Sequence, residues 1–438
     1  MKTIHNTARL RRRILSHDAV VGVVGQGYVG LSLACAAADV GFGAIGFDVD
    51  ARRVEDLSAG RLTVPGVDET LYHRAMATRR VEFATERERL AECDVILICV
   101  PTPVRDGTPD LSFVEVACRQ TAEHLSRGAL VILESTTYPG TTEERVQPLL
   151  ETSGLRGGAD FLLAYSPERI DPGNGEYGLQ NTPKIVGGVT PEATGAATLF
   201  YEQLTEKVVV VSSCRAAELA KLLENAFRHV NIALVNEMAM LCRDMDMDVW
   251  EVVDAAATKP FGFLPFYPGP GVGGHCIPLD SAYLAWQVRR EAGRQFRMLE
   301  LAEDVNGQMP SYVAMRIGEA LNDAGKSVKS AHILVLGVTY KADVGDLRES
   351  PALKVISHLL RRGADVTYHD PFVEEIVVNS TVLARSELTE RLVAGADCVV
   401  VLTPHHAYDL SWITEHAALV FDARNASRGV ASENLVRL

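Results

Sequence analysis

The chain has 438 residues, of which 47% are hydrophobic and 23% charged, the balance of a folded protein with two or three domains. Its formal net charge of −14 argues against a nucleic-acid partner, so an anionic ligand would have to meet local cations. No apolar run is long enough to span a membrane, and we expect a cytoplasmic protein without a membrane partner. The cysteines are scattered without metal-ligand spacing, so no metal site is predicted.

The first residues, MKTIHNTARLRRRILSHDAV, carry a basic cluster without an apolar segment, which predicts a solvated helix. After them, β-branched runs alternate with helical stretches: AVVGVVG, AIGFDVD, DVILICVPTP, ALVILEST, FLLAYSPE, KIVGG and KVVVVSS. This alternation is typical of buried parallel strands separated by helices. The predicted fold class is therefore α/β, with a doubly wound sheet.

A glycine fingerprint follows the first of these strands. Gly25, Gly27 and Gly30 form G-x-G-x-x-G between the strand and a helix of small residues. Such glycines allow a tight turn and close approach of a pyrophosphate, and the helix N-terminus supplies a positive dipole. Asp48 ends the second strand, where a carboxylate binds the ribose hydroxyls of NAD and repels the 2′-phosphate of NADP, although Arg53 nearby weakens that exclusion. The sequence thus predicts an NAD site.

Two later strand ends, CVPTP and ESTTYPG, are expected at the same carboxyl edge of the sheet, where they would frame the nicotinamide. The candidate cofactor-binding residues are Gly25, Gln26, Gly27, Tyr28, Val29, Gly30, Asp48, Arg53, Pro101, Thr102, Ser135 and Thr136.

The pattern changes after residue 212. Apolar residues recur at helical spacing through AAELAKLLENAFRHVNIALVNE, which predicts a long helix, and strands resume with HILVLGVTY, ADVTYHD, DCVVVLTP and ALVFDARN. We therefore expect an NAD-binding domain over 1–212, a central helical domain over 213–329 and a second α/β domain over 330–438. The fold would then be two Rossmann-like doubly wound domains joined by a long central helix.

The stretch PGPGVGGHCIPLD places Cys276 in a glycine-rich loop that backbone or substrate can approach closely, with Asp280 four residues later. A thiol in that setting suits covalent catalysis. Lys221 and Asn225 are four residues apart on one face of the long helix and could share a pocket with it. The alternatives are a structural cysteine and a solvated lysine, and His275 suits packing better than a role as base.

A dehydrogenase with a thiol can do more than convert an alcohol to a carbonyl. An aldehyde formed from a primary alcohol can be captured by the thiolate as a thiohemiacetal, oxidised to a thioester and released by water. In that scheme Lys221 and Asn225 stabilise the oxyanion and Asp280 helps to activate water.

Four stretches, VGVVGQGYVGLSLA, AELAKLLENAFRHVNIALVNE, PGPGVGGHCIPLD and LGVTYKADVGDLRESPALKV, together resemble the UDP-sugar 6-dehydrogenase family from the first domain to the last. The resemblance implies NAD as cofactor, a UDP-sugar as substrate, a homodimer built through the long helix and a role in polysaccharide biosynthesis. The catalytic residues that it implies are Cys276, Lys221, Asn225, Asp280, Glu168 and Thr136.

The resemblance also implies a set of substrate-binding residues, some around the sugar and some around the diphosphate. They are Glu168, Arg169, Lys221, Asn225, Arg228, Phe266, Tyr267, Gly271, Gly273, Lys341, Arg348 and Arg424. Arginines and lysines in an acidic chain would meet the anionic ligand that its charge requires.

The substrate branch is indicated by SPERIDPGN and ATKPFGFLPFYPGPGVGGHCIPLD, which are most similar to UDP-N-acetylglucosamine 6-dehydrogenases. UDP-glucose enzymes usually carry a second glutamate after the first, where this chain has Pro172. UDP-glucose and UDP-N-acetylmannosamine stay open as alternatives. Gln26, Ser32 and Ser281 depart from the family pattern, which indicates a divergent member.

Two rival functions remain at this point. A single-step dehydrogenase of the 6-phosphogluconate or hydroxy-acid kind shares the same order of domains but has no use for Cys276. A non-catalytic nucleotide-sugar sensor would keep the fold, but the presence of Cys276, Lys221, Asn225 and Asp280 together argues against it.

Overall fold

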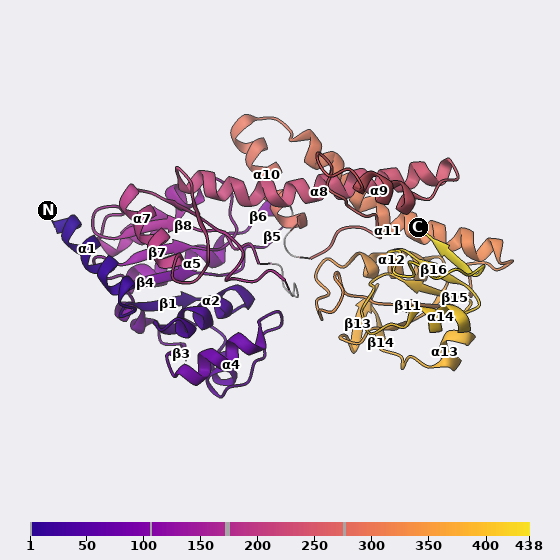
Figure 1. Ribbon diagram of the computed structural model, residues 1–438, viewed down its shortest axis with the longest axis horizontal. Coiled ribbons are helices and arrows are strands. Elements are labelled where there is room, and N and C mark those ends of the chain that lie inside the picture. Colours follow the sequence, from indigo (N-terminus) through magenta and orange to yellow (C-terminus); the bar gives the residue numbers. More distant parts are fainter. Residues whose placement is uncertain (1, 106, 171–175, 275–276) are drawn as a thin grey trace. The chain divides into compact units, whose positions relative to one another are not determined.

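The computed structural model describes residues 2–105, 107–170, 176–274 and 277–438 (Figure 1). The chain forms two compact units: the first unit comprises residues 1–224 and 282–293, and the second unit residues 225–281 and 294–438. The division into three domains stays a prediction. Among the described residues, no helix is long and apolar enough to cross a lipid bilayer.

The centre of the first unit is a sheet in the order β10-β9-β8-β7-β4-β1-β2-β3. The order from β3 to β8 is that of a dinucleotide-binding sheet, with its switch point between β1 and β4. The strands are β1 (Val20–Val24), β2 (Gly43–Phe47), β3 (Val81–Ala84), β4 (Val95–Ile98), β7 (Leu130–Leu133), β8 (Leu162–Tyr165), β9 (Lys184–Gly188) and β10 (Val208–Val210). The seven strand runs predicted for this half are confirmed, and β3 was not predicted.

Two strands, β9 and β10, depart from the expected all-parallel sheet. β9 pairs with β8 antiparallel, whereas the other neighbouring pairs of this sheet are parallel. A short buried apolar run such as KIVGG does not reveal its direction, because parallel and antiparallel strands can bury the same side chains. The first residue of β9 consequently lies beside the end of β8. A separate small hairpin pairs β5 (Val104–Arg105) with β6 (Thr108–Pro109).

Helices cover both faces of the first sheet. In β4, Val95 and Leu97 pack in one apolar cluster while Ile96 and Ile98 pack in another, as expected for a strand buried on both sides. The helices are α1 (Lys2–Leu15), α2 (Tyr28–Asp39), α3 (Ala51–Ser58), α4 (Glu69–Thr78), α5 (Ser112–His124), α6 (Gln147–Leu150) and α7 (Pro191–Tyr201), with short turns η1 (Arg87–Glu92), η2 (Thr142–Val146) and η3 (Glu151–Ser153).

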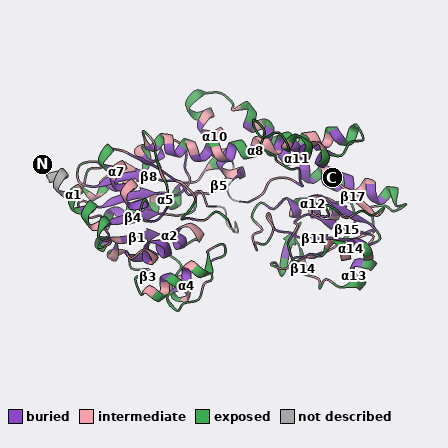
Figure 2. Cartoon of the chain, in the orientation of Figure 1, coloured by how far each residue is buried: buried purple, intermediate pink, exposed green. Residues whose placement is uncertain are grey.

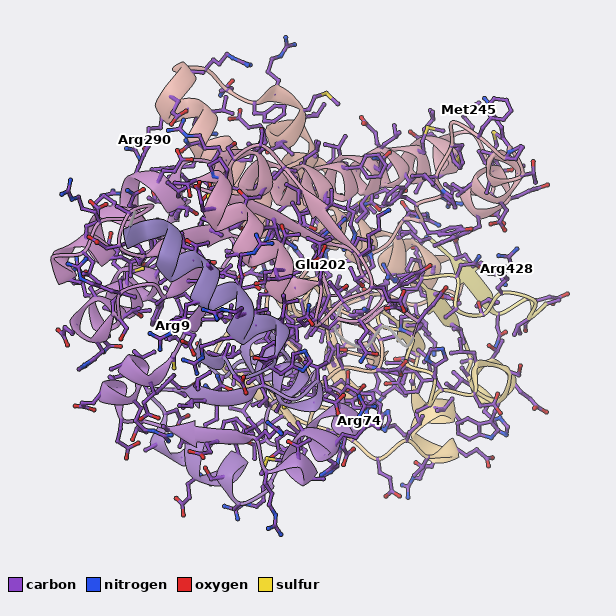
Figure 3. The ribbon with its side chains drawn as sticks, turned by 60° about the vertical axis from the view of Figure 1, so that its left-hand side comes forward. Arg9, Arg74, Glu202, Met245, Arg290 and Arg428 are labelled. Atoms are coloured by element: carbon purple, nitrogen blue, oxygen red, sulfur yellow. The ribbon has the colours of Figure 1, made fainter. Side chains whose placement is uncertain are left out.

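The N-terminal helix α1 is confirmed as a helix but not as a solvated one. Leu10 and Ile14 are buried in the core of the first unit, and Arg13 forms an ion pair of 2.8 Å with Asp94 at the start of β4. Arg9, labelled in Figure 3, lies on the exposed face. The prediction rested on the basic residues and overlooked Leu10 and Ile14, which are four residues apart and form the buried side of the helix.

The second unit is built on a parallel sheet in the order β12-β11-β15-β16-β17. Its elements are β11 (His332–Leu336), α12 (Pro351–Arg361), β12 (Asp365–His369), α13 (Glu390–Gly395), β15 (Cys398–Val401), α14 (Leu410–His416), β16 (Val420–Asp422) and β17 (Leu435–Arg437), with a hairpin of β13 (Glu375–Val378) and β14 (Thr381–Ala384). The four predicted strands are confirmed. In Figure 2 the strands of both sheets are largely purple, as buried sheets require.

The predicted long helix is α8 (Cys214–Asp244), and α9 (Val249–Ala257), α10 (Ile277–Ala292) and α11 (Arg297–Asp323) follow it. The two Rossmann-like domains and the long helix together confirm the predicted fold class. Part of the apolar pattern of α8 is not buried within the chain, because Leu219, Leu223, Phe227 and Leu234 are exposed.

Candidate functional site

The glycine fingerprint lies at the carboxyl end of β1. A Cβ atom on Gly30 would lie 1.9 Å from the Gly25 carbonyl oxygen. Only glycine at this position therefore lets the first turn of α2 pack so closely against the turn that precedes it. Gly25 has a φ of 95° and leaves no room either, since its Cβ would lie 2.5 Å from the Cys99 oxygen. Gly27, by contrast, has nothing within 4 Å of a Cβ position among the described atoms, and α2 begins directly after it. The turn therefore offers open space at a helix N-terminus, which suits a pyrophosphate.

Asp48 lies beside this turn, at the end of β2. Its Oδ2 atom accepts the Gln26 backbone N–H at 2.8 Å and the Arg53 Nη1 at 3.0 Å, and its Oδ1 accepts the Asp50 N–H at 2.9 Å. Asp48 is buried, while the Arg53 side chain is 38% exposed. The structure thus brings together three of the predicted cofactor residues, and it pairs Asp48, the predicted ribose ligand, with the partly exposed Arg53.

The departure at Gln26 has a structural account. Its side chain is fully buried, donates from Nε2 to the Val23 oxygen at 2.8 Å and leaves Oε1 without a hydrogen-bond partner among the described atoms. That oxygen lies against Gly46, whose Cβ would come within 2.5 Å of it. The amide thus occupies a core position and points away from the open side of the turn.

The remaining cofactor candidates line neighbouring strand ends. Tyr28 and Val29 open α2, and Pro101 is exposed. The Thr102 oxygen accepts the Tyr283 hydroxyl at 3.1 Å, and the Ser135 hydroxyl donates to the Val100 oxygen at 2.7 Å. Thr136 follows as a half-buried residue. These positions form the carboxyl edge of the sheet, where open α/β folds bind their ligands.

Glu168 lies at the same edge after β8. Its Oε1 accepts the backbone N–H groups of Arg169 and Ile170, both at 2.6 Å, and its Oε2 accepts Lys184 Nζ at 3.2 Å. Burial would raise the pKa of Glu168, but Lys184 and the two N–H groups outweigh it and hold the pKa below its ordinary value. The Arg169 guanidinium bonds to Glu224 and to the Pro183 oxygen.

In the second unit, the glycine-rich loop lies against the start of α12. A Cβ on Gly273 would lie 2.7 Å from the Glu349 oxygen and 2.9 Å from Pro351 Cδ, and Gly274 has a φ of 83° and packs on the Tyr340 ring. The Gly274 N–H donates to the Arg348 oxygen at 3.0 Å. Glycine is required here because the backbone of the loop touches the backbone of the second α/β segment.

A buried amide network supports the beginning of this loop. Asn236 on α8 accepts the Gly269 N–H at 3.0 Å and donates to Asn306 Oδ1 at 2.8 Å. Asn306 on α11 in turn donates to the His229 oxygen at 3.1 Å. Arg424 also reaches the loop, since its Nη1 lies 2.3 Å from where a Gly269 Cβ would be. Sequence reasoning missed both asparagines, because their partners are distant in the chain.

The catalytic candidates at the end of the loop are partly brought together. The Asn225 amide on α8 donates to Asp280 Oδ2 on the first turn of α10, and both residues are buried. Lys221 is also buried. Cys276 and His275 lie outside the described residues, and α10 begins at Ile277. A buried carboxylate held by an amide therefore follows the predicted nucleophile by four residues in the sequence.

The other substrate candidates differ in their surroundings. Phe266 packs edge-on against Phe227 at 5.7 Å, and Tyr267 stacks on Trp250 at 6.0 Å while its hydroxyl donates to Asp254 at 2.9 Å. Arg228 and Arg424 are exposed, Gly271 and Lys341 are half-buried, and the exposed Arg348 guanidinium binds Asp346 through two nitrogens.

The second sheet has an aspartate, Asp370, at the place that corresponds to Asp48 in the first sheet. Asp370 at the end of β12 accepts the Val338 N–H at 2.8 Å and the Phe372 N–H at 2.9 Å. The Asp343 N–H donates to His405 Nδ1 at 2.9 Å, so the proton of the neutral ring is on Nε2, which donates to Asp370 at 3.0 Å. His405 is fully buried, and the sequence had given no reason to single it out.

Two Rossmann-like sheets, one with an open glycine turn and a strand-end acid, define a dinucleotide-binding dehydrogenase with a second nucleotide-binding unit. Comparison with known sequences agrees. The UDP-glucose/GDP-mannose dehydrogenase family matches the chain with its NAD binding domain at residues 19–205, its central domain at 215–308 and its UDP binding domain at 334–428. The chain belongs to this family. It is an NAD-dependent UDP-sugar dehydrogenase, and the predicted family and cofactor are confirmed.

Individual relatives are similar along most of their length. The UDP-N-acetyl-D-mannosamine dehydrogenase of Pyrococcus horikoshii is 35% identical over 395 residues, 90% of this chain and 91% of the relative. The NDP-N-acetyl-D-galactosaminuronic acid dehydrogenase of Ralstonia nicotianae is 35% identical over 399 residues, 89% and 91% of the two chains. The solved structure of UDP-D-ManNAc dehydrogenase from Pyrococcus horikoshii superposes with a TM-score of 0.86 at 33% identity, covering 95% of this chain and 98% of that one.

Proposed function

We propose that the chain oxidises the C6 alcohol of a UDP-N-acetylhexosamine to the carboxylate in two steps, with Cys276 holding the carbon between them. The C6 alcohol first loses a hydride and a proton to become the aldehyde, and NAD, when bound, would supply the hydride acceptor for this oxidation and for the second one. The Cys276 thiolate adds to the C6 aldehyde, the resulting thiohemiacetal loses a hydride and a proton to become a thioester, and water releases the acid and the free thiol. One sugar and one water are consumed.

The observation that carries this proposal is the buried Asn225–Asp280 hydrogen bond at the start of α10. Asp280 follows Cys276 by four residues, and an acid fixed there is suited to orient or activate the hydrolytic water. Lys221 and Asn225 would stabilise the oxyanion of the thiohemiacetal, since an ammonium and an amide both donate to a developing negative charge. Thr136 and Glu168, at the carboxyl edge of the first sheet, complete the proposed set.

The cofactor residues would hold NAD by three kinds of contact. The open space at Gly27 and the N-terminus of α2 would receive the pyrophosphate. Asp48 would accept from the adenosine ribose in place of Arg53, and Thr102, Ser135 and their neighbours would border the nicotinamide.

The UDP group would bind in the second unit, with Lys341, Arg348 and Arg424 as cations for the diphosphate. The loop supports this role, because Gly274 bonds to the Arg348 backbone and Gly269 packs against Arg424. Phe266, Tyr267, Gly271 and Gly273 would then border the sugar.

For the sugar itself, the sequence motifs favour UDP-N-acetylglucosamine, and this remains our prediction. UDP-N-acetylmannosamine is a second candidate, supported by the names of relatives from Pyrococcus horikoshii and Escherichia coli at 35% and 32% identity. The two sugars differ only in configuration at C2. The contacts that the protein makes around the acetamido group at C2 therefore decide between them.

The protein is proposed to act as a homodimer. Leu219, Leu223, Phe227 and Leu234 leave a row of exposed apolar side chains along α8, at the spacing of one helix face. A second copy of the same helix would cover that row by a two-fold contact. Sedimentation of the wild type beside a Leu223→Glu variant tests this, and two equally monomeric proteins would remove the proposal.

The function is tested by counting NADH formed per UDP-sugar consumed, in parallel on UDP-N-acetylglucosamine, UDP-N-acetylmannosamine and UDP-glucose. Two NADH per sugar on one preferred substrate are expected. One NADH would mean that the reaction stops at a carbonyl, and none with any sugar would favour the sensor. Cys276→Ser and Cys276→Ala should abolish formation of the acid, and undiminished turnover by either would refute the covalent role.

A further inference from the structure

A buried ion cluster lies in the first unit behind Glu168. Lys184 Nζ is 2.7 Å from Glu134 Oε2 and 3.2 Å from Glu168 Oε2, and all three side chains are less than one tenth exposed. The buried Tyr201 hydroxyl donates to the other oxygen of Glu134. Neither Lys184, Glu134 nor Tyr201 has a role in the function proposed above.

The antiparallel strand explains why a lysine is found there. Glu134 follows β7 and Glu168 follows β8, so both lie at the carboxyl edge of parallel strands. Lys184 is the first residue of β9, which runs in the opposite direction to β8. Its amino end is therefore brought to the edge where β7 and β8 finish, and the ammonium reaches both carboxylates.

The charges of the cluster do not cancel if every group is ionised. One ammonium faces two carboxylates, and a surplus negative charge in a buried site is strongly disfavoured. Glu168 accepts two backbone N–H bonds and the ammonium, whereas Glu134 accepts the ammonium and a neutral phenol. Glu168 is thus the better stabilised anion. Glu134 is the better place for a proton, which would lie on Oε1 with the Tyr201 hydroxyl turned to accept from it.

We propose that Lys184 is a positioning residue for the dehydrogenase reaction: it holds Glu168 ionised at the carboxyl edge of the sheet, while Glu134 takes up the proton that balances the cluster. Lys184 acts through Glu168 and does not itself touch the substrate. The inference rests on the proposed function only in giving Glu168 a part in turnover.

The electrostatic surroundings support this division. Burial raises the pKa of Glu134 to about 7 against the lowering effect of Lys184. Burial lowers the pKa of Lys184, but the two carboxylates outweigh it and raise the pKa above its ordinary value. Among the described residues, the other titratable groups that face Glu134 are Tyr201 and Cys99. Burial raises the pKa values of both well above the ordinary range, so both stay neutral.

Removal of the Lys184 ammonium should favour protonation of Glu168. In Lys184→Met, two carboxylates remain in one buried site, their pKa values rise, and Glu168 becomes protonated near neutral pH. The acid limb of the kcat/KM profile for the UDP-sugar should then move to higher pH by about one unit or more, a loss of about tenfold at a pH below the limb. Lys184→Arg keeps the charge and should keep the limb near its wild-type pH.

A matched control separates this effect from loss of stability. Arg13→Met also removes one cation from an ion pair with a carboxylate of the same sheet, at its opposite edge beside Asp94. We expect the control to lower the melting temperature and to leave the acid limb unmoved. A Lys184→Met profile that coincides with that of Arg13→Met, with only the melting temperature lowered, would overturn the proposal.

A second measurement is independent of turnover. Protein labelled with ¹³C at the glutamate carboxyl carbon is titrated by NMR, and Glu134→Gln and Glu168→Gln identify the two buried signals. We expect Glu134 to titrate near neutral pH, Glu168 to stay ionised there, and Glu168 to titrate at a higher pH in Lys184→Met. An unshifted Glu168 signal refutes the inference even in an active enzyme, whereas a shifted signal with no activity on any UDP-sugar places the failure in the proposed function.

Discussion

The hydrogen bond between Asn225 and Asp280 makes the most direct prediction about the site. Asn225→Ala removes the amide that donates to the Asp280 carboxylate and leaves that buried group without this partner. Because the carboxylate would lose its orientation as well as a donor, the variant should lose both stability and turnover.

The size of the effect follows from the kind of bond. A hydrogen bond to a charged group contributes about 1.5–3 kcal/mol, and both partners are buried, so the upper part of this range applies. In a double-mutant cycle of Asn225→Ala and Asp280→Ala, the coupling in unfolding free energy should be about 2 kcal/mol. The corresponding loss in kcat for Asn225→Ala alone is about tenfold to a hundredfold.

The assay is urea unfolding of the wild type, the two single variants and the double variant, with kcat measured on the same preparations. Asn231→Ala is the matched control, because Asn231 lies on the same helix and its amide donates in an exposed hydrogen bond to the Phe227 oxygen of that helix, at 2.7 Å. The control should change stability by less than about 0.5 kcal/mol. Single-variant effects that add within about 0.5 kcal/mol would refute the coupling and with it the role assigned to the pair.

Three further predictions concern other parts of the molecule. Gly273→Ala should raise the KM for the UDP-sugar and destabilise the chain by about 1–3 kcal/mol, because its Cβ would meet the Glu349 oxygen at 2.7 Å. Gly307→Ala, with open space around it in α11, should have neither effect. Equal effects of the two variants in thermal unfolding and kinetics would contradict this prediction. Glu134 has a folded pKa of about 7, above its unfolded value, so its contribution to stability falls as pH rises from about 4.5 to 7; Glu134→Gln should therefore gain melting temperature relative to the wild type above pH 7 and lose that advantage near pH 5, and a constant difference would contradict the assignment. Asp48→Ser should raise the KM for NAD about tenfold and lower that for NADP, and an unchanged ratio of the two cofactors in steady-state kinetics would remove Asp48 from the ribose site.

The parts of this fold that the sequence predicted are those with a local signal. The glycine turn, Asp48 and the helix that follow one another along the chain need only short-range spacing to be recognised. The buried strands were predicted for the same reason, since continuous β-branched runs mark them. The motif around Cys276 likewise lies in one uninterrupted stretch.

Features that depend on pairing across the chain were not predictable. The direction of β9 leaves no trace in KIVGG, and the Lys184 ion pairs join residues 50 and 16 positions apart in the chain. Asn236 and Asn306 are 70 positions apart and resemble ordinary polar helix residues. A buried polar group is identified by its partner, and one sequence without its fold does not supply the partner.

The two acids Asp48 and Asp370 occupy matching places in the two sheets but have different partners. Each carboxylate ties the end of the second strand to the loop after the first, through a backbone N–H at 2.8 Å, and each accepts one further side-chain donor at 3.0 Å. In the first sheet that donor is the Arg53 guanidinium, whose side chain is 38% exposed. In the second sheet that donor is the imidazole of His405, which is fully buried and occupies the space beside Asp370. A redesign of the second unit to bind a dinucleotide would therefore have to replace His405 as well as introduce a glycine turn, because the buried imidazole already occupies the Asp370 carboxylate.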